Sequence, residues 1–70
     1  MAEAKVDGVY RHPEGEFRVI CNAKGWNSKE NYVVCKNIRT GANWLVREDE
    51  FFATEERDGK RVRVFEYREG

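Results

Sequence analysis

The chain has few of the residues that build catalytic or metal centres. It contains one histidine and two cysteines, and Cys21 and Cys35 do not form the C-x-x-C spacing that is typical of zinc sites. Glycine-rich phosphate loops and the H-E-x-x-H pattern are also missing. Together with His12, the cysteines offer at most three ligands. We therefore expect no metal site, no cofactor and no catalytic residue.

Long apolar runs are also missing. No stretch approaches the roughly 18–20 residues that a membrane span requires, and residues 1–8 contain no apolar segment of the kind found in signal peptides. We therefore expect a soluble, cytoplasmic protein that does not bind membranes. In that compartment, Cys21 and Cys35 are expected to stay reduced, as buried thiols within strands. A disulfide between them would require neighbouring strands.

The formal net charge is 0, so nothing in the overall charge favours nucleic acid as a partner. The charges are unevenly distributed, since residues 17–47 include six basic residues and one acid. Both flanking segments are acidic. Alternating charges on exposed strand faces are the simplest explanation of this pattern, so the charge distribution by itself identifies no partner.

What the chain does contain points to a small folded domain. Aromatic residues make up 13% of it and there is a single proline, which argues against disorder. A chain of 8.3 kDa buries roughly 60% of the surface that its unfolded form exposes. That is sufficient for one thin core, in which the large rings supply much of the volume.

The apolar pattern predicts short strands separated by turns that contain glycine. The clearest strand is 16–24, where alternation places Phe17, Val19, Cys21 and Ala23 on one face and only Ile20 departs from the pattern. Further strands are predicted over residues 8–12, 31–38, 43–47, 53–57 and 60–67. In the last of these a bulge or a two-sided strand is expected.

Two local signals complete the predicted fold. Asp58-Gly59 is a typical two-residue hairpin turn, and three acids before Phe51 and Phe52 predict one helical turn over 48–52. We expect a mainly β, single-domain protein: a small, antiparallel, strongly bent sheet or an SH3-like open barrel of five to six strands with one short helical turn. The alternative is a curled sheet capped by the turn at 48–52. Residues 1–7 are predicted to be a flexible leader, 8–67 the β domain and 68–70 a tail.

Four short motifs occur in order along the domain. They are G-x-Y-R-H at Gly8–His12, W-x-V-R at Trp44–Arg47, D-G-K at Asp58–Lys60 and F-E-Y at Phe65–Tyr67. This set resembles the small bacterial domain-of-unknown-function family 1653. The resemblance implies a short bacterial protein with a single β domain and no assigned reaction. The chain differs from the family pattern after Ala23, at Glu48 and at Val64.

The first candidate site is the segment 24–29, in which Trp26 lies between Lys24 and Lys29. An aromatic ring flanked by positive charges is typical of proteins that bind single-stranded nucleic acid. Tryptophan is also frequent at the centre of protein interfaces. The alternative is that Trp26 folds back as a lid over the core, so the exposure of Trp26 separates the two interpretations.

The second candidate site combines Tyr10, Arg11, His12 and Arg47. His12 is the residue that titrates near neutrality, and a pair of arginines can hold a carboxylate or a phosphate. A ligand site would require Tyr10, His12 and Arg47 to converge on one concavity. The alternative is that His12, which precedes Pro13 at a strand end, has a role in the turn or in packing.

The sequence therefore favours a non-catalytic binding or adaptor module, with a protein partner preferred over nucleic acid, acting as a monomer or weak dimer. The alternative is a small ligand-binding or enzymatic domain that uses the Tyr/His/Arg cluster. The consecutive acids Glu48, Asp49 and Glu50 are expected to be a solvated helix start, because three adjacent residues of a regular element do not point the same way.

Overall fold

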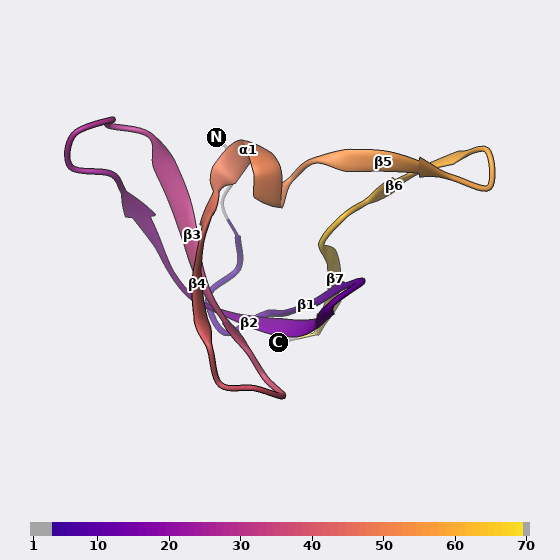
Figure 1. The fold of residues 1–70 in the computed structure, drawn as a ribbon, viewed down its shortest axis with the longest axis horizontal. Coiled ribbons are helices and arrows are strands. Elements are labelled where there is room, and N and C mark those ends of the chain that lie inside the picture. Colours follow the sequence, from indigo (N-terminus) through magenta and orange to yellow (C-terminus); the bar gives the residue numbers. More distant parts are fainter. Residues whose placement is uncertain (1–3, 70) are drawn as a thin grey trace.

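A computed structural model of the protein describes residues 4–69, which form seven strands and one short helix (Figure 1). The strands are β1 (Val9–His12), β2 (Gly15–Lys24), β3 (Asn31–Asn37), β4 (Asn43–Arg47), β5 (Thr54–Arg57), β6 (Lys60–Arg63) and β7 (Glu66–Glu69). The helix α1 (Glu48–Phe51) connects β4 to β5. The mainly β fold with one helical turn is therefore as predicted.

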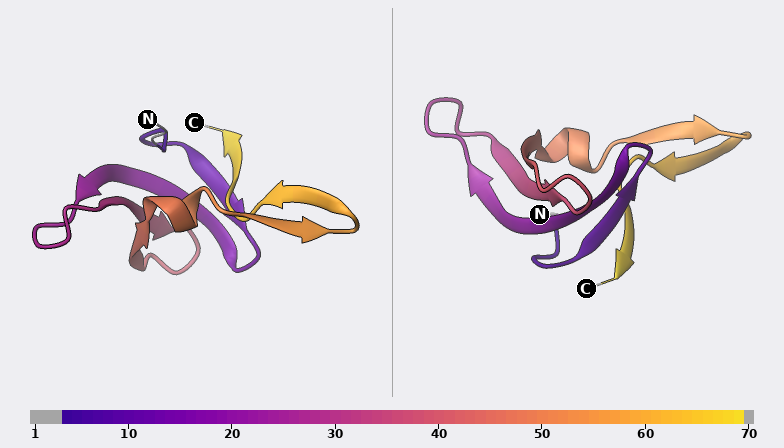
Figure 2. Two further views of the ribbon diagram at one scale, coloured as in Figure 1. Left: turned by 90° about the horizontal axis from the view of Figure 1, so that it is seen from above. Right: turned by 60° about the horizontal axis from the view of Figure 1, so that its bottom comes forward.

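Five of these strands form one antiparallel sheet in the order β4-β3-β2-β1-β7, and β5 pairs only with β6. The sheet is strongly curved, α1 lies on its concave side, and the β5–β6 hairpin extends away from it (Figures 1 and 2). The sheet does not close into a barrel, since β4 and β7 are its two edges. The strongly bent sheet is confirmed, in the form of a curled sheet capped by the turn that contains α1.

The strand predicted over residues 60–67 is two strands with different partners. β6 pairs with β5, whereas β7 pairs with β1. Between them, Val64 N donates a hydrogen bond to Ala53 O at 3.1 Å, and Phe65 is buried. The chain changes direction here because Phe65 enters the core while Arg61 and Arg63 stay exposed. The prediction of a single strand was wrong for this reason, and the described residues contain more strands than the five to six expected.

A bulge at Ile20 reverses the alternation predicted for β2. Val19 pairs with Cys35 and Cys21 pairs with Val34, so Ile20 is the extra residue between two ladder positions. Phe17 and Val19 face the core as predicted, but Cys21 is exposed. The extra residue turns the rest of the strand over, so that every side chain after it changes face.

Asn22 occupies the inner position that Cys21 was expected to fill. It pairs with the fully buried Val33. Its side-chain amide donates to Ala4 O at 2.8 Å, and its Oδ1 accepts from Ala4 N at 3.2 Å. This polar side chain therefore ties the N-terminal segment to the sheet.

Residues 4–7, predicted to belong to the flexible leader, are packed against the domain. Ala4 is only 3% exposed, and Lys5 N donates to the hydroxyl of the buried Tyr10 at 3.1 Å. At the other end of the chain, β7 extends to Glu69, into the predicted tail. The predictions for residues 1–3 and 70 lie outside the described residues.

Phe51 is the centre of the core. It is fully buried, its ring stacks on Phe65 at a centroid distance of 4.5 Å, and it meets Tyr10 edge-on at 4.9 Å. The other buried apolar residues around it are Ala4, Phe17, Val19, Val33 and Cys35. The helix that carries Phe51 has four residues and no side-chain N-cap. Because so short a helix is unstable by itself, the burial of Phe51 stabilises it.

Cys21 and Cys35 lie on neighbouring strands but are not paired with each other, and both are free thiols. Cys35 is fully buried as predicted, and burial raises the pKa of its thiol above the ordinary value of 9.0. Cys21 is exposed, so the prediction that it is buried was wrong. The reason is the bulge at Ile20, which places Cys21 on the outer face.

Replacing Phe51 with alanine should lower the free energy of unfolding by about 3–5 kcal/mol, as expected for a fully buried ring. A domain of this size is stabilised by only about 4–10 kcal/mol, so Phe51→Ala should lose a third or more of the stability. Urea denaturation followed by circular dichroism measures the loss. The matched control is the adjacent Phe52→Ala, whose ring is partly exposed. Equal losses for the two variants would contradict the central position of Phe51.

The two cysteines should react with Ellman's reagent at different rates. Cys21 should react rapidly in the folded protein, and Cys35 only as fast as the protein opens, because its thiol is buried and its pKa is raised. The variant Cys21→Ala should therefore lose the rapid phase. Since the folded protein keeps Cys35 protonated, its contribution to stability should be present below about pH 9 and lost at higher pH. A rapid phase in Cys21→Ala would contradict the burial of Cys35.

Candidate functional site

The loop between β2 and β3, residues 25–30, is closed by hydrogen bonds of its own. Gly25 N donates to Glu30 O at 2.7 Å, and Lys29 N donates to Gly25 O at 3.0 Å. Glu30 N donates to Ser28 Oγ at 3.2 Å. A Cβ atom at position 25 would lie 2.6 Å from Ser28 Oγ and 2.8 Å from the ring of Tyr32, so glycine is required there. The loop is therefore an ordered hairpin tip, which we call the Trp26 loop.

The Trp26 loop presents its indole ring to solvent. Trp26 is 84% exposed, the largest exposed fraction among the large apolar side chains described. Lys29 Nζ lies 4.8 Å from the ring centroid, a cation–π contact that orients the ring. Lys24, at the end of β2, is also exposed. The interpretation of Trp26 as a lid over the core was therefore wrong, and the ring is free to contact a partner.

The structure does not bring Tyr10, His12 and Arg47 together. Tyr10 is 7% exposed, and its ring lies between Phe51 and Tyr67 in the core. Arg47 lines a hollow of about 260 Å³ beside α1, whereas His12 lines two others. None of these three hollows is lined by both. The convergence that a ligand site would require is not found in these hollows, because β1 and β4 are separated by two strands of the sheet.

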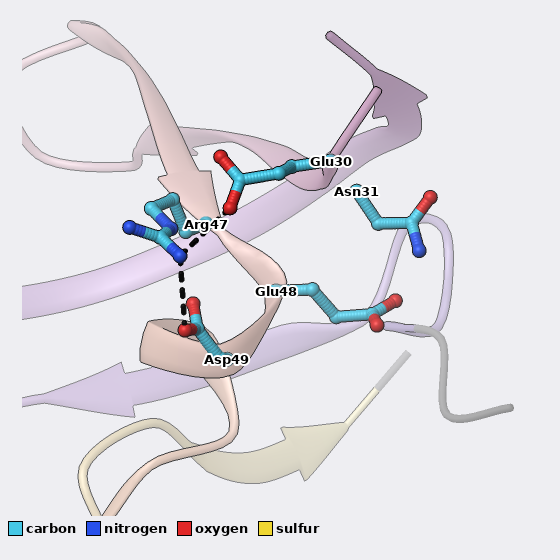
Figure 3. A pocket seen from close by; sticks show the side chains of 5 residues that line it. All are labelled: Glu30, Asn31, Arg47, Glu48 and Asp49. Atoms are coloured by element: carbon cyan, nitrogen blue, oxygen red, sulfur yellow. Dashed lines mark hydrogen bonds and ion pairs between the residues drawn. The ribbon is translucent and has the colours of Figure 1, made fainter. Parts of the chain in front are cut away.

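Arg47 is paired with carboxylates. Its Nη2 atom lies 2.9 Å from Glu30 Oε1 and 3.3 Å from Asp49 Oδ2 (Figure 3). Glu48 points away from this group (Figure 3). Arg11, the other arginine of the predicted cluster, lies 4.0 Å from Glu16 Oε2. Both arginines therefore already have carboxylate partners, in pairs whose side chains are about half exposed.

His12 has the role in turn and packing that the sequence left as its alternative. Its Nδ1 atom accepts a hydrogen bond from Glu14 N at 3.0 Å, which closes the turn between β1 and β2. Its ring lies 4.6 Å from Phe65 and 5.9 Å, edge-on, from Phe17. These contacts account for the histidine without a catalytic role.

Beside His12 lies an aromatic groove that the sequence analysis did not identify. It has a volume of about 160 Å³ and is lined by His12, Glu14, Phe17, Trp44, Val46 and Phe65. Phe17 and Phe65 are buried, while Trp44 is 54% exposed. Trp44 and Val46 alternate along β4 and so share a face, which is the sequence signal that could have located them. An apolar or aromatic group fits this groove best.

Among residues 4–69, no group of three or more His, Cys, Asp or Glu side chains is placed to hold a metal ion. Glu48, Asp49 and Glu50 lie in the first turn of α1. Within the same residues, no helix has the length and apolar character needed to cross a membrane.

Comparisons with known proteins give no match to a protein-family model, to a curated protein or to a solved structure. The resemblance to domain-of-unknown-function family 1653 and the cytoplasmic location stay predictions.

Replacing Arg47 with methionine should change the free energy of unfolding by less than about 1 kcal/mol, because its ion pairs are exposed and screened by solvent. Thermal unfolding at low and at high salt measures the change, and Glu30→Gln is the matched variant on the opposite side of the pair. A loss of several kcal/mol would indicate that this cluster has a larger structural role than its exposure implies.

Proposed function

We propose that the protein is a non-catalytic binding module that contacts a protein partner through the Trp26 loop. The observation that carries the proposal is an almost fully exposed indole on a closed, hydrogen-bonded loop. Surface exposure of so large an apolar ring is unfavourable in water. Its burial against a partner would recover that free energy, and tryptophan is among the residues that dominate interface energetics.

The order of the loop adds to this proposal. Binding costs conformational entropy when flexible side chains and loops must be immobilised. In the Trp26 loop the backbone is already closed by the bonds between Gly25, Lys29 and Glu30, and Lys29 lies over the indole. The cost of ordering the contact residue is therefore low, which suits a loop that acts as an anchor.

The charges next to Trp26 support a protein partner with acidic groups. Lys24 and Lys29 are exposed, and the nearest acid of the loop, Glu30, is paired with Arg47. Single-stranded nucleic acid is the second candidate, because a ring between two lysines can stack on a base. The zero net charge makes this partner less favoured, and salt dependence separates the two.

The alternative of a ligand-binding or enzymatic domain loses its basis in the fold. It required Tyr10, His12 and Arg47 to share one concavity, and these residues lie in the core, beside the aromatic groove and beside α1 respectively. Each has contacts that account for it without a substrate. The proposal therefore rests on the Trp26 loop.

The substitution Trp26→Ala should abolish capture of the partner without destabilising the domain. Immobilised wild-type protein and the variant are incubated with nuclease-treated host lysate, and retained proteins are quantified by mass spectrometry. We expect at least about a 30-fold loss of specific partners, as for an interface hot spot, with stability within about 0.5 kcal/mol of the wild type. The matched control is Ile38→Ala, an exposed apolar residue in the β3–β4 turn, which should retain the partners.

Two results would contradict the proposal. If Trp26→Ala retains the same proteins as the wild type, the Trp26 loop is not the contact. If a labelled single-stranded oligonucleotide binds through Trp26, with an affinity that falls steeply as salt is added, the partner is nucleic acid. Fluorescence of Trp26 in a Trp44→Phe background measures both kinds of binding directly.

A further inference from the structure

Strand β4 forms an open edge of the sheet. It pairs with β3 and has no second neighbour among the described strands. At the turn before it, Asn37 N donates to Ala42 O and Gly41 N donates to Asn37 O, both at 2.8 Å. These two bonds show which pairs of the β3–β4 ladder exchange hydrogen bonds, because bonded and non-bonded pairs alternate along an antiparallel ladder.

The alternation determines which backbone groups of β4 face outward. Counting from Asn37, the pairs of Trp44 with Cys35 and of Val46 with Val33 are the hydrogen-bonded ones. Asn43 and Leu45 therefore direct their backbone N–H and C=O groups to the open side, and Arg47 directs its N–H there, because as the N-cap of α1 its carbonyl belongs to the helix. The edge offers a regular row of donors and acceptors to another strand.

The two edges of the sheet differ in how well they are protected. Natural sheets protect their edges with charged residues, proline, bulges or a covering element. At one edge, β7 carries the exposed charges of Glu66 and Arg68. At the other edge, β4 has Arg47 as its one charged residue, at its last position, and that guanidinium is paired with two acids. The middle of β4, Trp44 to Val46, therefore has no charged residue or proline that would keep another strand from pairing with it.

Two side chains in the middle of β4 are also exposed. Trp44 is 54% and Leu45 64% exposed. On the outer face Leu45 pairs with Val34, which pairs with the exposed Cys21. These three residues form an apolar row across β2, β3 and β4 that ends at the open edge. A strand added to β4 would therefore meet apolar side chains on the outer face.

We propose that the strand added to β4 is β4 of a second copy of this chain, paired antiparallel about a two-fold axis at Leu45. In this register Leu45 faces Leu45 of the second copy, Trp44 faces Val46, and Asn43 faces Arg47. The two facing Leu45 residues then exchange two backbone hydrogen bonds, and the Arg47 N–H of each copy donates to Asn43 O of the other. A shift of the axis to Trp44 or to Val46 leaves one of these residues without a partner and places Leu45 opposite Asn43 or Arg47.

The symmetry of the β4 edge and the absence of facing like charges favour a second copy as the occupant. In the register centred on Leu45, no like charges face each other, and an aromatic ring faces a β-branched residue, which is a favourable cross-strand pair. The apolar row of Cys21, Val34 and Leu45 continues across the axis into its own copy. Because the same edge is used by both copies, the contact closes as a dimer and leaves no β4 edge for further growth.

The dimer would also determine where the aromatic groove and the two Trp26 loops lie relative to the second copy. Val46 of the second copy would lie against Trp44, beside the aromatic groove. The antiparallel arrangement would place the two Trp26 loops at opposite ends of one continuous sheet. The inference does not depend on what the Trp26 loop binds, so it can fail or succeed separately from the proposed function.

Sedimentation equilibrium over a range of protein concentrations tests the dimer. The wild type should show a monomer–dimer equilibrium, and Leu45→Lys should raise the dissociation constant at least about tenfold, because it replaces an apolar pair with two facing ammonium groups. The matched control is Val6→Lys, which changes an exposed apolar residue away from β4 and should not alter the equilibrium. Circular dichroism confirms that both variants are folded. A wild type that stays monomeric up to its solubility limit would overturn the proposal.

Disulfide cross-linking with a mild oxidant tests the register in a Cys21→Ala background. Leu45→Cys should form a covalent dimer, since directly facing residues have Cα atoms about 5.5 Å apart, within reach of a disulfide. Asn43→Cys should not cross-link to itself across about 14 Å, four residues along the strand. Combined with Arg47→Cys, it should cross-link. Equal cross-linking of Leu45→Cys and Asn43→Cys would overturn the proposed register.

Discussion

The stacked pair of Phe51 and Phe65 is the contact on which the rest of the structure depends. The two rings lie 4.5 Å apart on the concave side of the sheet, and the β5–β6 hairpin is the segment of chain between them. The stack therefore closes the core and at the same time holds the base of a hairpin that pairs with none of the other described strands. A two-stranded hairpin is marginally stable by itself, so its position follows from the two rings at its base.

A core of this size can cover only one face of the sheet. Phe51, Phe65 and the residues around them fill the concave side, while the outer face carries Leu45, Val34 and Cys21 without a layer over them. Trp26 at a hairpin tip and the edge strand β4 also lie outside this core. Both surfaces suit the binding of another protein chain: the Trp26 loop by one exposed aromatic anchor, and β4 by backbone hydrogen bonds along an edge.

The candidate site was only partly predictable from the sequence. Trp26 was identified because it lies in a polar loop between two lysines, and a loop is where exposed contact residues occur. The residues of the alternative Tyr/His/Arg cluster do not share one of the described hollows, because residues that are close in a motif or alike in chemistry can face different parts of the fold. Tyr10 is buried in the core, His12 accepts a hydrogen bond that closes a turn, and Arg47 forms an ion pair with Glu30 beside α1. The aromatic groove was missed because its residues come from three separate parts of the chain, residues 12–17, 44–46 and 65.

Local preferences in the sequence determined the positions of most strands and turns. The bounds of β4 are those predicted, and Asp58 and Gly59 adopt the positive φ angles, 52° and 76°, of the expected two-residue hairpin turn. Only the tertiary structure decided the bulge at Ile20, the division of the last predicted strand into β6 and β7, and the burial of Ala4. Each of these depends on pairing between segments far apart in the chain. Such pairing sets which face of a strand is buried, and the alternation of residues within one strand cannot reveal it.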